Sequence, residues 1–319
     1  MHALVVRPVS IARLLVGGLA LTVALVLLLT WPHAASAATD PVRAKVERAN
    51  KLHEAGQYTQ ALALFQEAAQ QGDSHAMFYI GWMTRAGQGG RADGPYARRW
   101  FEEAALRGSR GAMRELGRMN LEGSGGPRNA EIAVKWLGEA IRRDDLDAME
   151  ILAIAYYQGS IGRTDYGLAM KWFRYLAGRG VSNAMNWMGV MYAEGAGVPQ
   201  DNCQAADWYR RAVKADSAGA TPARFNLGRF HQFGLCMPVD LAKARELFQT
   251  ALRFGDEDSK EALASLDRGP ALSGSGREET RYEKRPDYWM IERYTPPPPP
   301  PPTYVPPISP FYGQPCWGC

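Results

Sequence analysis

The sequence has few of the residues, and none of the short motifs, on which catalytic and metal sites are usually built. Its 319 residues include five histidines and four cysteines, and no two histidines have the His-x-x-x-His spacing of a zinc site. Neither the Ser-x-x-Lys nor the Gly-x-Ser-x-Gly nucleophile motif occurs. We therefore expect no catalytic residue, no metal ion and no cofactor.

Charge of one sign is also scarce. The formal net charge is +4, and residues 1–37 carry only Arg7 and Arg13, so the rest of the chain has a net charge of 4 − 2 = +2. Proteins that bind nucleic acids usually carry a strongly basic surface. We therefore expect no nucleic-acid partner.

Long apolar runs are missing except at the N-terminus. Arg7 and Arg13 precede an apolar run of 18 residues, Leu14–Trp31, and the small residues Ala35-Ser36-Ala37 follow it. A basic region, an apolar region and an A-x-A site together predict a secretory signal peptide over 1–37, cut after Ala37. The run is also long enough to span a bilayer, so an uncleaved anchor is the alternative. In either case we expect a periplasmic or secreted protein, with membrane contact only if the segment stays uncleaved.

The middle of the chain repeats one pattern, which is clearest over residues 184–212. Ala184, Met188 and Tyr192 share one face of a helix, Gly195 breaks this helix, and Asp201 is a suitable N-cap for a second one. The second helix has its own apolar stripe, formed by Ala205, Trp208, Tyr209 and Ala212. The pattern predicts two helices joined by a turn.

This unit starts five times, with steps of 36, 36, 36 and 39 residues, at Ala76, Ala112, Ala148, Ala184 and Ala223, and a truncated start falls at Ser259. Three positions recur in every full unit. They are a turn glycine (Gly87, Gly123, Gly159, Gly195, Gly234), an N-cap (Asp93, Asn129, Asp165, Asp201, Asp240) and an alanine (Ala97, Ala133, Ala169, Ala205, Ala244). Four units also carry a tryptophan, Trp100, Trp136, Trp172 or Trp208, which we expect in the core. Such a period predicts a solenoid, in which each unit packs on its neighbours.

The pattern A-x-x-x-L-G-x-x-Y-x-x-G-x-G-V-x-x-D-x-x-x-A-x-x-W-Y resembles the Sel1-like repeat family, which is related to the tetratricopeptide repeat. The resemblance covers residues 42–267, and single units depart from it, for example with Leu247 in place of the tryptophan and Cys236 in place of the second turn glycine. It implies an all-α fold, a right-handed α/α solenoid with a concave face. It also implies a role in binding or scaffolding, usually of proteins.

Both ends of the solenoid are expected to be atypical, because an end must cover its own apolar face. Within the solenoid at 38–267, a first helix pair is predicted over 42–71 and a capping helix over 259–267. Residues 268–295 read as a linker. In the tail, residues 296–319, 11 of 24 residues are proline, which predicts polyproline II or disorder. This tail could be a ligand for an aromatic groove on a partner, or a stiff spacer.

The four cysteines are Cys203, Cys236, Cys316 and Cys319, and an even number in an exported chain suggests disulfides. Equivalent positions in adjacent units are about 8–10 Å apart, too far for a bridge. Cys203 and Cys236 are not equivalent positions, however, and the turn can bring them closer. We therefore predict that they form a staple. Cys316 and Cys319 form a CxxC motif, which is a redox motif in thioredoxin-like proteins but lies here in a proline-rich tail.

The concave face of a solenoid that curves like a tetratricopeptide array should be lined by the first helix of each unit. Residues two, three and six after each start are then predicted to face the groove and to bind a partner. The predicted groove residues are Phe78, Tyr79, Trp82, Arg114, Arg118, Asn186, Trp187, Phe225, Asn226 and Arg229. The alternative for part of this set is packing between units.

Taken together, the sequence predicts an exported, non-enzymatic scaffold or adaptor in the cell envelope. Its partner would be a protein or peptide, or an envelope glycan. The alternative is a periplasmic enzyme or redox accessory that uses the C-terminal CxxC motif.

Overall fold

A computed structural model of the chain describes residues 41–216 and 220–268. The predicted signal peptide, linker, proline-rich tail and CxxC motif lie outside these residues. Within them the structure contains 13 helices and no strand. The helices are α2 (Pro41–Glu54), α3 (Tyr58–Gln70), α4 (Ser74–Ala86), α5 (Gly94–Leu106), α6 (Arg110–Glu122), α7 (Ala130–Ile141), α8 (Leu146–Gln158), α9 (Tyr166–Gly178), α10 (Ser182–Glu194), α11 (Asn202–Ala215), α12 (Thr221–Phe233), α13 (Leu241–Arg253) and α14 (Asp258–Arg268).

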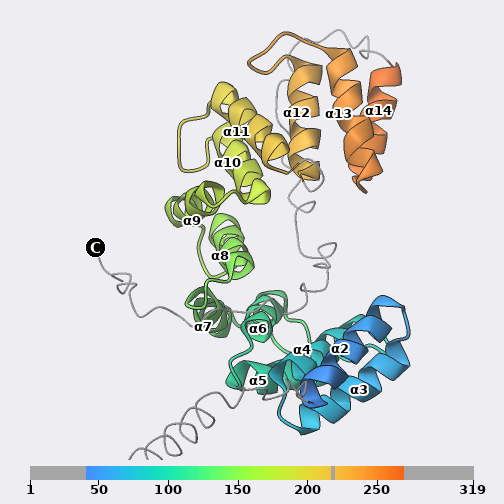
Figure 1. The fold of residues 1–319 in the computed structure, drawn as a ribbon. Helices are drawn as coiled ribbons and strands as arrows, with labels where there is room; N and C mark the ends of the chain where they lie inside the picture. Colours follow the sequence, from blue (N-terminus) through green and yellow to red (C-terminus); the bar gives the residue numbers. More distant parts are fainter. Residues whose placement is uncertain (1–40, 217–219, 269–319) are drawn as a thin grey trace, which may run out of the picture.

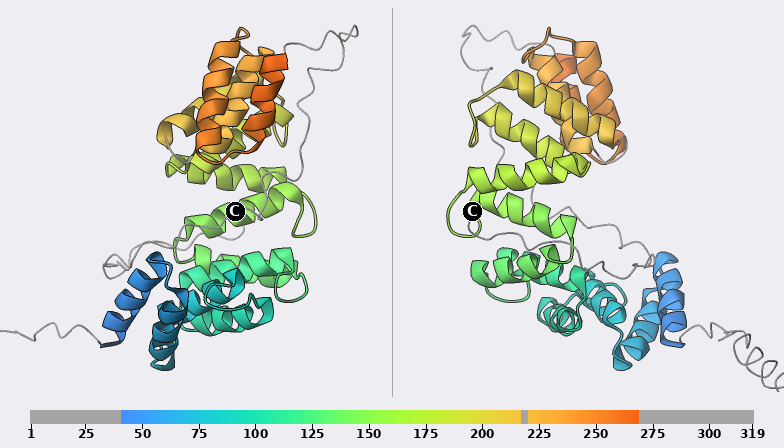
Figure 2. Two further views of the ribbon diagram at one scale, coloured as in Figure 1. Left: turned by 90° about the vertical axis from the view of Figure 1, so that its right-hand side faces the viewer. Right: turned by 60° about the vertical axis from the view of Figure 1, so that its left-hand side comes forward.

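The helices form an α/α solenoid, which confirms the predicted fold class. Each helix packs against the next one in the chain, so α4 and α5 form a pair that stacks on the pair α6 and α7. The stack is bent into a C, with α4, α6, α8 and α10 on its inner side and α5, α7 and α9 on its outer side (Figure 1). The inner helices α6 and α8, and likewise α10 and α12, also contact one another directly. Figure 2 shows the same continuous stack from two other sides.

The predicted caps explain where the second helix of each unit begins. The side chains of Asp93, Asn129, Asp165 and Asp240 each accept a hydrogen bond from a backbone N–H group three residues on, and Asp201 accepts two. Such a bond satisfies one of the N–H groups that a helix start leaves unpaired. The turn glycines end the first helices in the left-handed conformation, as in Gly195 with φ of 71°. The sequence therefore fixes both borders of each turn.

The core of each pair is formed by the recurrent alanine and by one large residue of the second helix. Phe101, Leu137, Phe173, Tyr209 and Phe248 are fully buried. The tryptophans that precede four of these residues in the chain are partly buried and pack against the core, so the prediction that they belong to the core holds only in part. The reason is geometric, because consecutive residues of a helix point about 100° apart.

Close approach of the two helices in a pair depends on a glycine in the first one. A Cβ atom added to Gly117 would lie 2.4 Å from the Leu137 side chain, and one added to Gly189 would lie 2.4 Å from the Tyr209 ring. The third unit has Ala153 at this position. Glycine thus lets the large buried residue of the second helix pack directly on the backbone of the first.

The helices are short relative to a lipid bilayer. In residues 41–216 and 220–268, none has both the length and the apolar character needed to span a membrane.

Candidate binding face

Polar side chains connect each first helix to the next along the inner side of the C. On α4 and α6, Arg85 Nη1 lies 3.5 Å from Glu115 Oε2. Corresponding contacts follow from α6 to α8 (Arg114–Asp147, 2.8 Å), from α8 to α10 (Glu150–Asn183 and Tyr157–Glu194), from α10 to α12 (Asn186–Asn226, 3.0 Å) and from α12 to α14 (Gln232–Ser265, 3.1 Å). We call this set the inner ladder. Because every link joins side chains of different units, the ladder fixes the spacing of the inner helices.

The first part of the inner ladder is a network of charges that balance one another. Four arginines and four carboxylates take part, namely Arg85, Arg110, Arg114, Arg118, Glu115, Glu122, Asp145 and Asp147. Glu115 is 1% exposed and is surrounded by Arg85, Arg114 and Arg118. Removing one partner from such a buried pair would leave an uncompensated charge. The network therefore holds α4, α6 and α8 together.

Arg114 is the residue through which this network crosses from α6 to α8. Its Nη1 atom lies 3.1 Å from Asp145 Oδ2 and 2.8 Å from Asp147 Oδ2. Burial by itself would lower the pKa of the guanidinium, but the two carboxylates outweigh burial and raise it. Arg114 is therefore a permanent cation that ties the start of α8 to α6.

Glu150, on the first turns of α8, stands in a different environment. Its half-buried carboxyl group accepts a hydrogen bond from the Asn183 amide on α10. Burial raises the pKa of this carboxyl to about 7, opposed by the bond from Asn183 and helped by the negative charge of Asp147. The inner face thus has a carboxyl group that titrates near neutral pH.

Most of the predicted groove residues pack between helices. Phe78 and Phe225 contact the large buried residue of their own second helix, with ring centroids 5.7 Å from Phe101 and 5.6 Å from Phe248. Tyr79 and Trp187 instead stack on the preceding pair. The ring centroid of Tyr79 lies 4.9 Å from that of Phe65, and the centroid of Trp187 lies 5.5 Å from that of Phe173. The position three after each start therefore points toward the previous unit.

Burial separates the ten predicted groove residues into two groups. Seven are buried, with at most 8% of the residue exposed, namely Phe78, Tyr79, Trp82, Arg118, Asn186, Trp187 and Asn226. Three are partly exposed, namely Arg114, Phe225 and Arg229. The guanidinium of Arg229 lies 5.4 Å from the centre of the Phe233 ring. A role in partner binding stays a prediction for all ten, and the structure leaves Arg114, Phe225 and Arg229 the most accessible.

Several members of the inner ladder were missed by the sequence analysis. Asp147 and Asn183 stand one residue before the alanine that starts their unit, while Tyr157 and Glu194 stand nine and ten residues after it. Together with the positions two and six after the start, these form one stripe along a helix. A search for polar residues along that stripe would have found them. The predicted groove set shares the positions two and six with this stripe, but it also includes the position three, which faces the previous unit.

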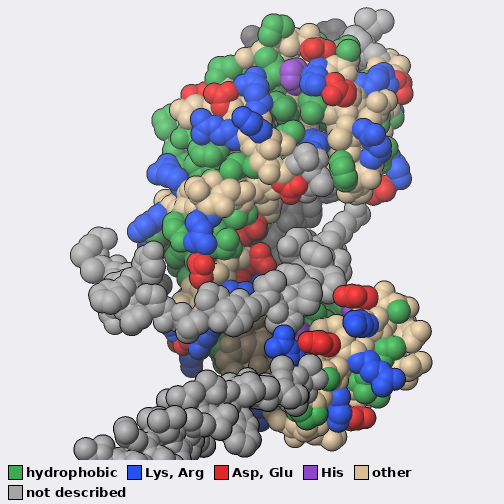
Figure 3. Space-filling model, viewed as in Figure 1, with side chains coloured by type: hydrophobic (Ala, Val, Ile, Leu, Met, Phe, Trp, Pro, Cys, Tyr) green, Lys and Arg blue, Asp and Glu red, His purple; other side chains and the backbone are tan. Residues whose placement is uncertain are grey.

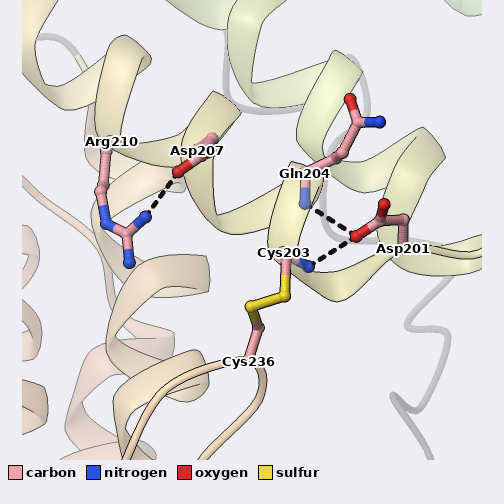
Figure 4. The surroundings of a disulfide bond; sticks show 6 residues. All are labelled: Asp201, Cys203, Gln204, Asp207, Arg210 and Cys236. Carbon is pink, nitrogen blue, oxygen red and sulfur yellow. Dashed lines mark hydrogen bonds and ion pairs between the residues drawn. A yellow bond between two sulfur atoms is a disulfide. The ribbon is translucent and has the colours of Figure 1, made fainter.

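The structure brings together the two cysteines of the predicted staple, whose formation in the exported protein stays a prediction. Cys203, in the first turn of α11, is bonded to Cys236 in the turn between α12 and α13, with Cα atoms 5.1 Å apart (Figure 4). Asp201 accepts hydrogen bonds from the backbone N–H groups of Cys203 and Gln204, which fixes the helix start from which the first sulfur projects. In residues 41–216 and 220–268, no three His, Cys, Asp or Glu side chains lie together in a way that could hold a metal ion.

The surface also shows no strong charge preference on the face displayed in Figure 3. Blue Lys and Arg side chains and red Asp and Glu side chains alternate over it without one large patch of either sign. This agrees with the low net charge of the sequence.

Comparison with known proteins places the repeats in a family. The family model described as "Sel1 repeat" matches residues 54–73, 74–109, 111–145, 146–181, 182–217 and 221–255. No curated protein matches the chain.

Two solved structures show the relationship in three dimensions. A Sel1 repeat protein from Oxalobacter formigenes is 29% identical with a TM-score of 0.62, and the match covers 69% of this chain and 89% of that one. The protective antigen c5321 of uropathogenic Escherichia coli, which displays an SLR fold, is 26% identical with a TM-score of 0.59. That match covers 75% of this chain but 52% of the antigen, so the chain spans about half of the antigen's length.

Proposed function

The chain belongs to the Sel1 repeat family, and from this premise we propose that it is an exported, non-enzymatic protein that binds a protein or peptide partner on the inner face of its solenoid. Sel1 repeat proteins generally mediate protein–protein interactions, and the fold is typically a scaffold. An envelope glycan is the second class of partner that the proposal admits.

The proposal rests on a contrast between two kinds of position in the repeat. Some positions pack the helices of a unit together, and others lie on the inner side of the C. The packing positions hold apolar residues in every unit, either a small one or a large one according to the position. Two residues after the start, by contrast, the chain has Phe78, Arg114, Glu150, Asn186 and Phe225. Phe78 and Asn186 are buried and serve packing, but Arg114, Glu150 and Phe225 are partly exposed and differ from one another in charge and shape. A surface of changing chemistry on a rigid scaffold suits recognition of one particular partner.

Export is supported by the N-terminal pattern and by the cysteine pair. A basic segment, an apolar run and Ala35-Ser36-Ala37 are the features of a signal peptide. A structural disulfide between Cys203 and Cys236 would persist only in an oxidising compartment such as the periplasm or the extracellular space. N-terminal sequencing of the exported protein decides the matter, since a chain that begins at Ala38 supports cleavage and one that retains Met1 supports an anchor.

Partner capture tests the proposed inner face with a matched pair of variants. Arg229→Glu changes a partly exposed residue of α12, on the inner side of the C. Lys171→Glu makes the same charge change at an exposed residue of α9, on the outer side. Each variant and the wild type would capture proteins from envelope extract, and the binding of each captured protein would then be measured directly with purified components. The proposal expects binding to fall at least tenfold for Arg229→Glu and to stay unchanged for Lys171→Glu. Equal binding by both variants would show that the partner does not use this face.

A further inference from the structure

The turn between α12 and α13 exposes three large apolar side chains at one end of the solenoid. Phe233 is 38% exposed, Val239 is 59% exposed and Leu241 is 47% exposed. Phe233 ends α12, Leu241 begins α13 and Val239 lies in the turn between them. We call these three residues the end patch. Large exposed apolar side chains at both borders and inside one turn of the chain point to a surface that is covered in the working protein.

The repeat fold itself does not require the end patch. In the four preceding units, the position of Phe233 holds Ala86, Glu122, Gln158 and Glu194, and that of Val239 holds Ala92, Arg128, Thr164 and Gln200. The position of Leu241 holds Gly94, Ala130, Tyr166 and Asn202. Only the last full unit has large apolar residues at all three positions. Their cause must therefore be sought at this end of the molecule.

The described part of the chain ends beside this patch. Ser265 on α14 accepts a hydrogen bond of 3.1 Å from the side chain of Gln232, the neighbour of Phe233. Asp267 lies 2.6 Å from Arg245, which is one helical turn after Leu241. Figures 1 and 2 both show the α12–α13 turn and the end of α14 at the same end of the helices. The chain therefore continues past Arg268 within a short distance of the end patch.

We propose that the segment Tyr288-Trp289-Met290-Ile291 of the same chain docks on the end patch. It is the first apolar cluster after Arg268, since residues 269–287 contain small, polar and charged residues with Leu272 and Tyr282 as single exceptions. These 19 residues reach up to about 65 Å when extended, which is far more than the fold-back requires. The aromatic rings of the segment offer large apolar area at a small loss of side-chain freedom.

Attachment to the same chain makes even a weak contact effective. A segment tethered by a short linker has an effective concentration on the order of millimolar at its site. A docking contact of millimolar affinity is then about half occupied. A separate partner would have to compete with this tethered segment for the end patch. The proposal therefore assigns the end patch to Tyr288–Ile291 of the same chain.

Hydrogen–deuterium exchange of the full chain tests the docking from both sides. The first variant is Trp289→Ala, with Trp317→Ala as its control, because Trp317 is another tryptophan beyond the described residues but outside the proposed segment. The second is Val239→Gln with Leu241→Asn, which installs the residues that the fourth unit has at these positions. Its control is Leu106→Gln, which removes a side chain that is 75% exposed at a distant site. Exchange over residues 74–194 reports whether each variant is folded.

We expect Trp289→Ala to raise the exchange rate of amides 234–241 at least threefold, and Val239→Gln with Leu241→Asn to raise that of residues 286–292. Neither control should do so. Unchanged exchange of amides 234–241 in Trp289→Ala would overturn the proposal, whether or not the double variant folds. Protection that is lost on dilution, together with a dimer mass in light scattering, would also overturn it and would show that a second copy covers the patch.

Discussion

Cys236, in the turn between α12 and α13, is bonded to Cys203 at the start of α11. In other units the equivalent turn position is a glycine that packs against the second helix of the preceding unit. A Cβ atom added to Gly197 would lie 2.8 Å from Cβ of Tyr166, at the start of α9. In the last full unit the equivalent residue is Cys236, whose φ is 60°, and the covalent bond to α11 replaces this contact. The left-handed region is unfavourable for most residues that carry a Cβ atom, cysteine among them. The disulfide therefore holds a turn conformation that the sequence otherwise disfavours.

Two variants separate the contribution of the bond from the strain of the turn. Cys203→Ser should lower the free energy of unfolding by about 2–4 kcal/mol, the usual effect of losing a disulfide. Cys203→Ser with Cys236→Gly should recover about 1 kcal/mol of this loss, because glycine adopts positive φ without strain. Denaturant unfolding followed by circular dichroism measures both. A double variant less stable than Cys203→Ser would contradict the account of the turn.

The glycines of the first helices should differ sharply in their tolerance of a methyl group. Gly189→Ala should lower the free energy of unfolding by about 1–3 kcal/mol, because the new Cβ would lie 2.4 Å from the buried Tyr209 ring. Gly138→Ala, in the interior of α7, is the matched control, since the nearest atom is the end of the Arg142 side chain at 3.9 Å. It should stabilise the chain by up to about 1 kcal/mol through helix propensity. Similar losses in both variants would show that close helix approach does not explain Gly189.

The fold could be predicted from the sequence because the same information is repeated in every unit. Each N-cap, turn glycine and buried alanine marks one border or one packing position, and five copies make the period unmistakable. The prediction failed where the repeat period does not tell which of two adjacent side chains points into the core. Trp172 and Phe173 recur together, and only the structure shows that Phe173 is fully buried while Trp172 stays partly exposed. Local spacing determines that two large residues are adjacent, but packing between the helices decides which one enters the core.

Glu150 should make stability depend on pH. Its pKa is raised from 4.5 to about 7 in the folded chain, foremost by burial, so folding favours the protonated form. The stabilisation is complete below pH of about 4.5 and is lost as the pH rises through about 7. Glu150→Gln keeps an acceptor for the Asn183 amide and carries no charge. It should therefore be more stable than the wild type at pH 8, by about 1–3 kcal/mol after allowance for partial exposure, and nearly equal to it at pH 4.5.

Glu139→Gln provides the control for this pH dependence. Hydrogen bonds from Arg143 and Arg142 lower the pKa of the partly exposed Glu139 carboxyl, so its removal should bring no gain in stability at pH 8. Unfolding curves of the three proteins at pH 4.5, 6, 7 and 8 are sufficient. A wild type and a Glu150→Gln variant that keep the same difference at every pH would refute the assignment.

The candidate site was less predictable than the fold, because it depends on which way a helix faces in the curved stack. Arg114 was found from the sequence, but its partners in the next unit, Asp145 and Asp147, were not. An ion pair between units joins residues about 30 positions apart, and nothing in local spacing reveals it. The positions two, three and six after each start were treated alike, although the stacking of Trp187 on Phe173 shows that the third position belongs to the packing between units.

Trp187 and Arg229 should therefore behave as two different kinds of residue, although the sequence places both in the groove. Trp187 is 3% exposed and contacts the rings of Phe173 and Tyr157, with centroids 5.5 Å and 5.1 Å away. Its replacement by alanine leaves a cavity, and we expect the free energy of unfolding to fall by about 3–5 kcal/mol. Arg229 is partly exposed, and its replacement by alanine should change stability by less than about 1 kcal/mol while weakening partner capture. Thermal unfolding and capture are measured on both variants. A large loss of stability in Arg229→Ala with capture intact would place this residue among the packing residues and would leave Arg114 and Phe225 as the accessible candidates of the predicted set.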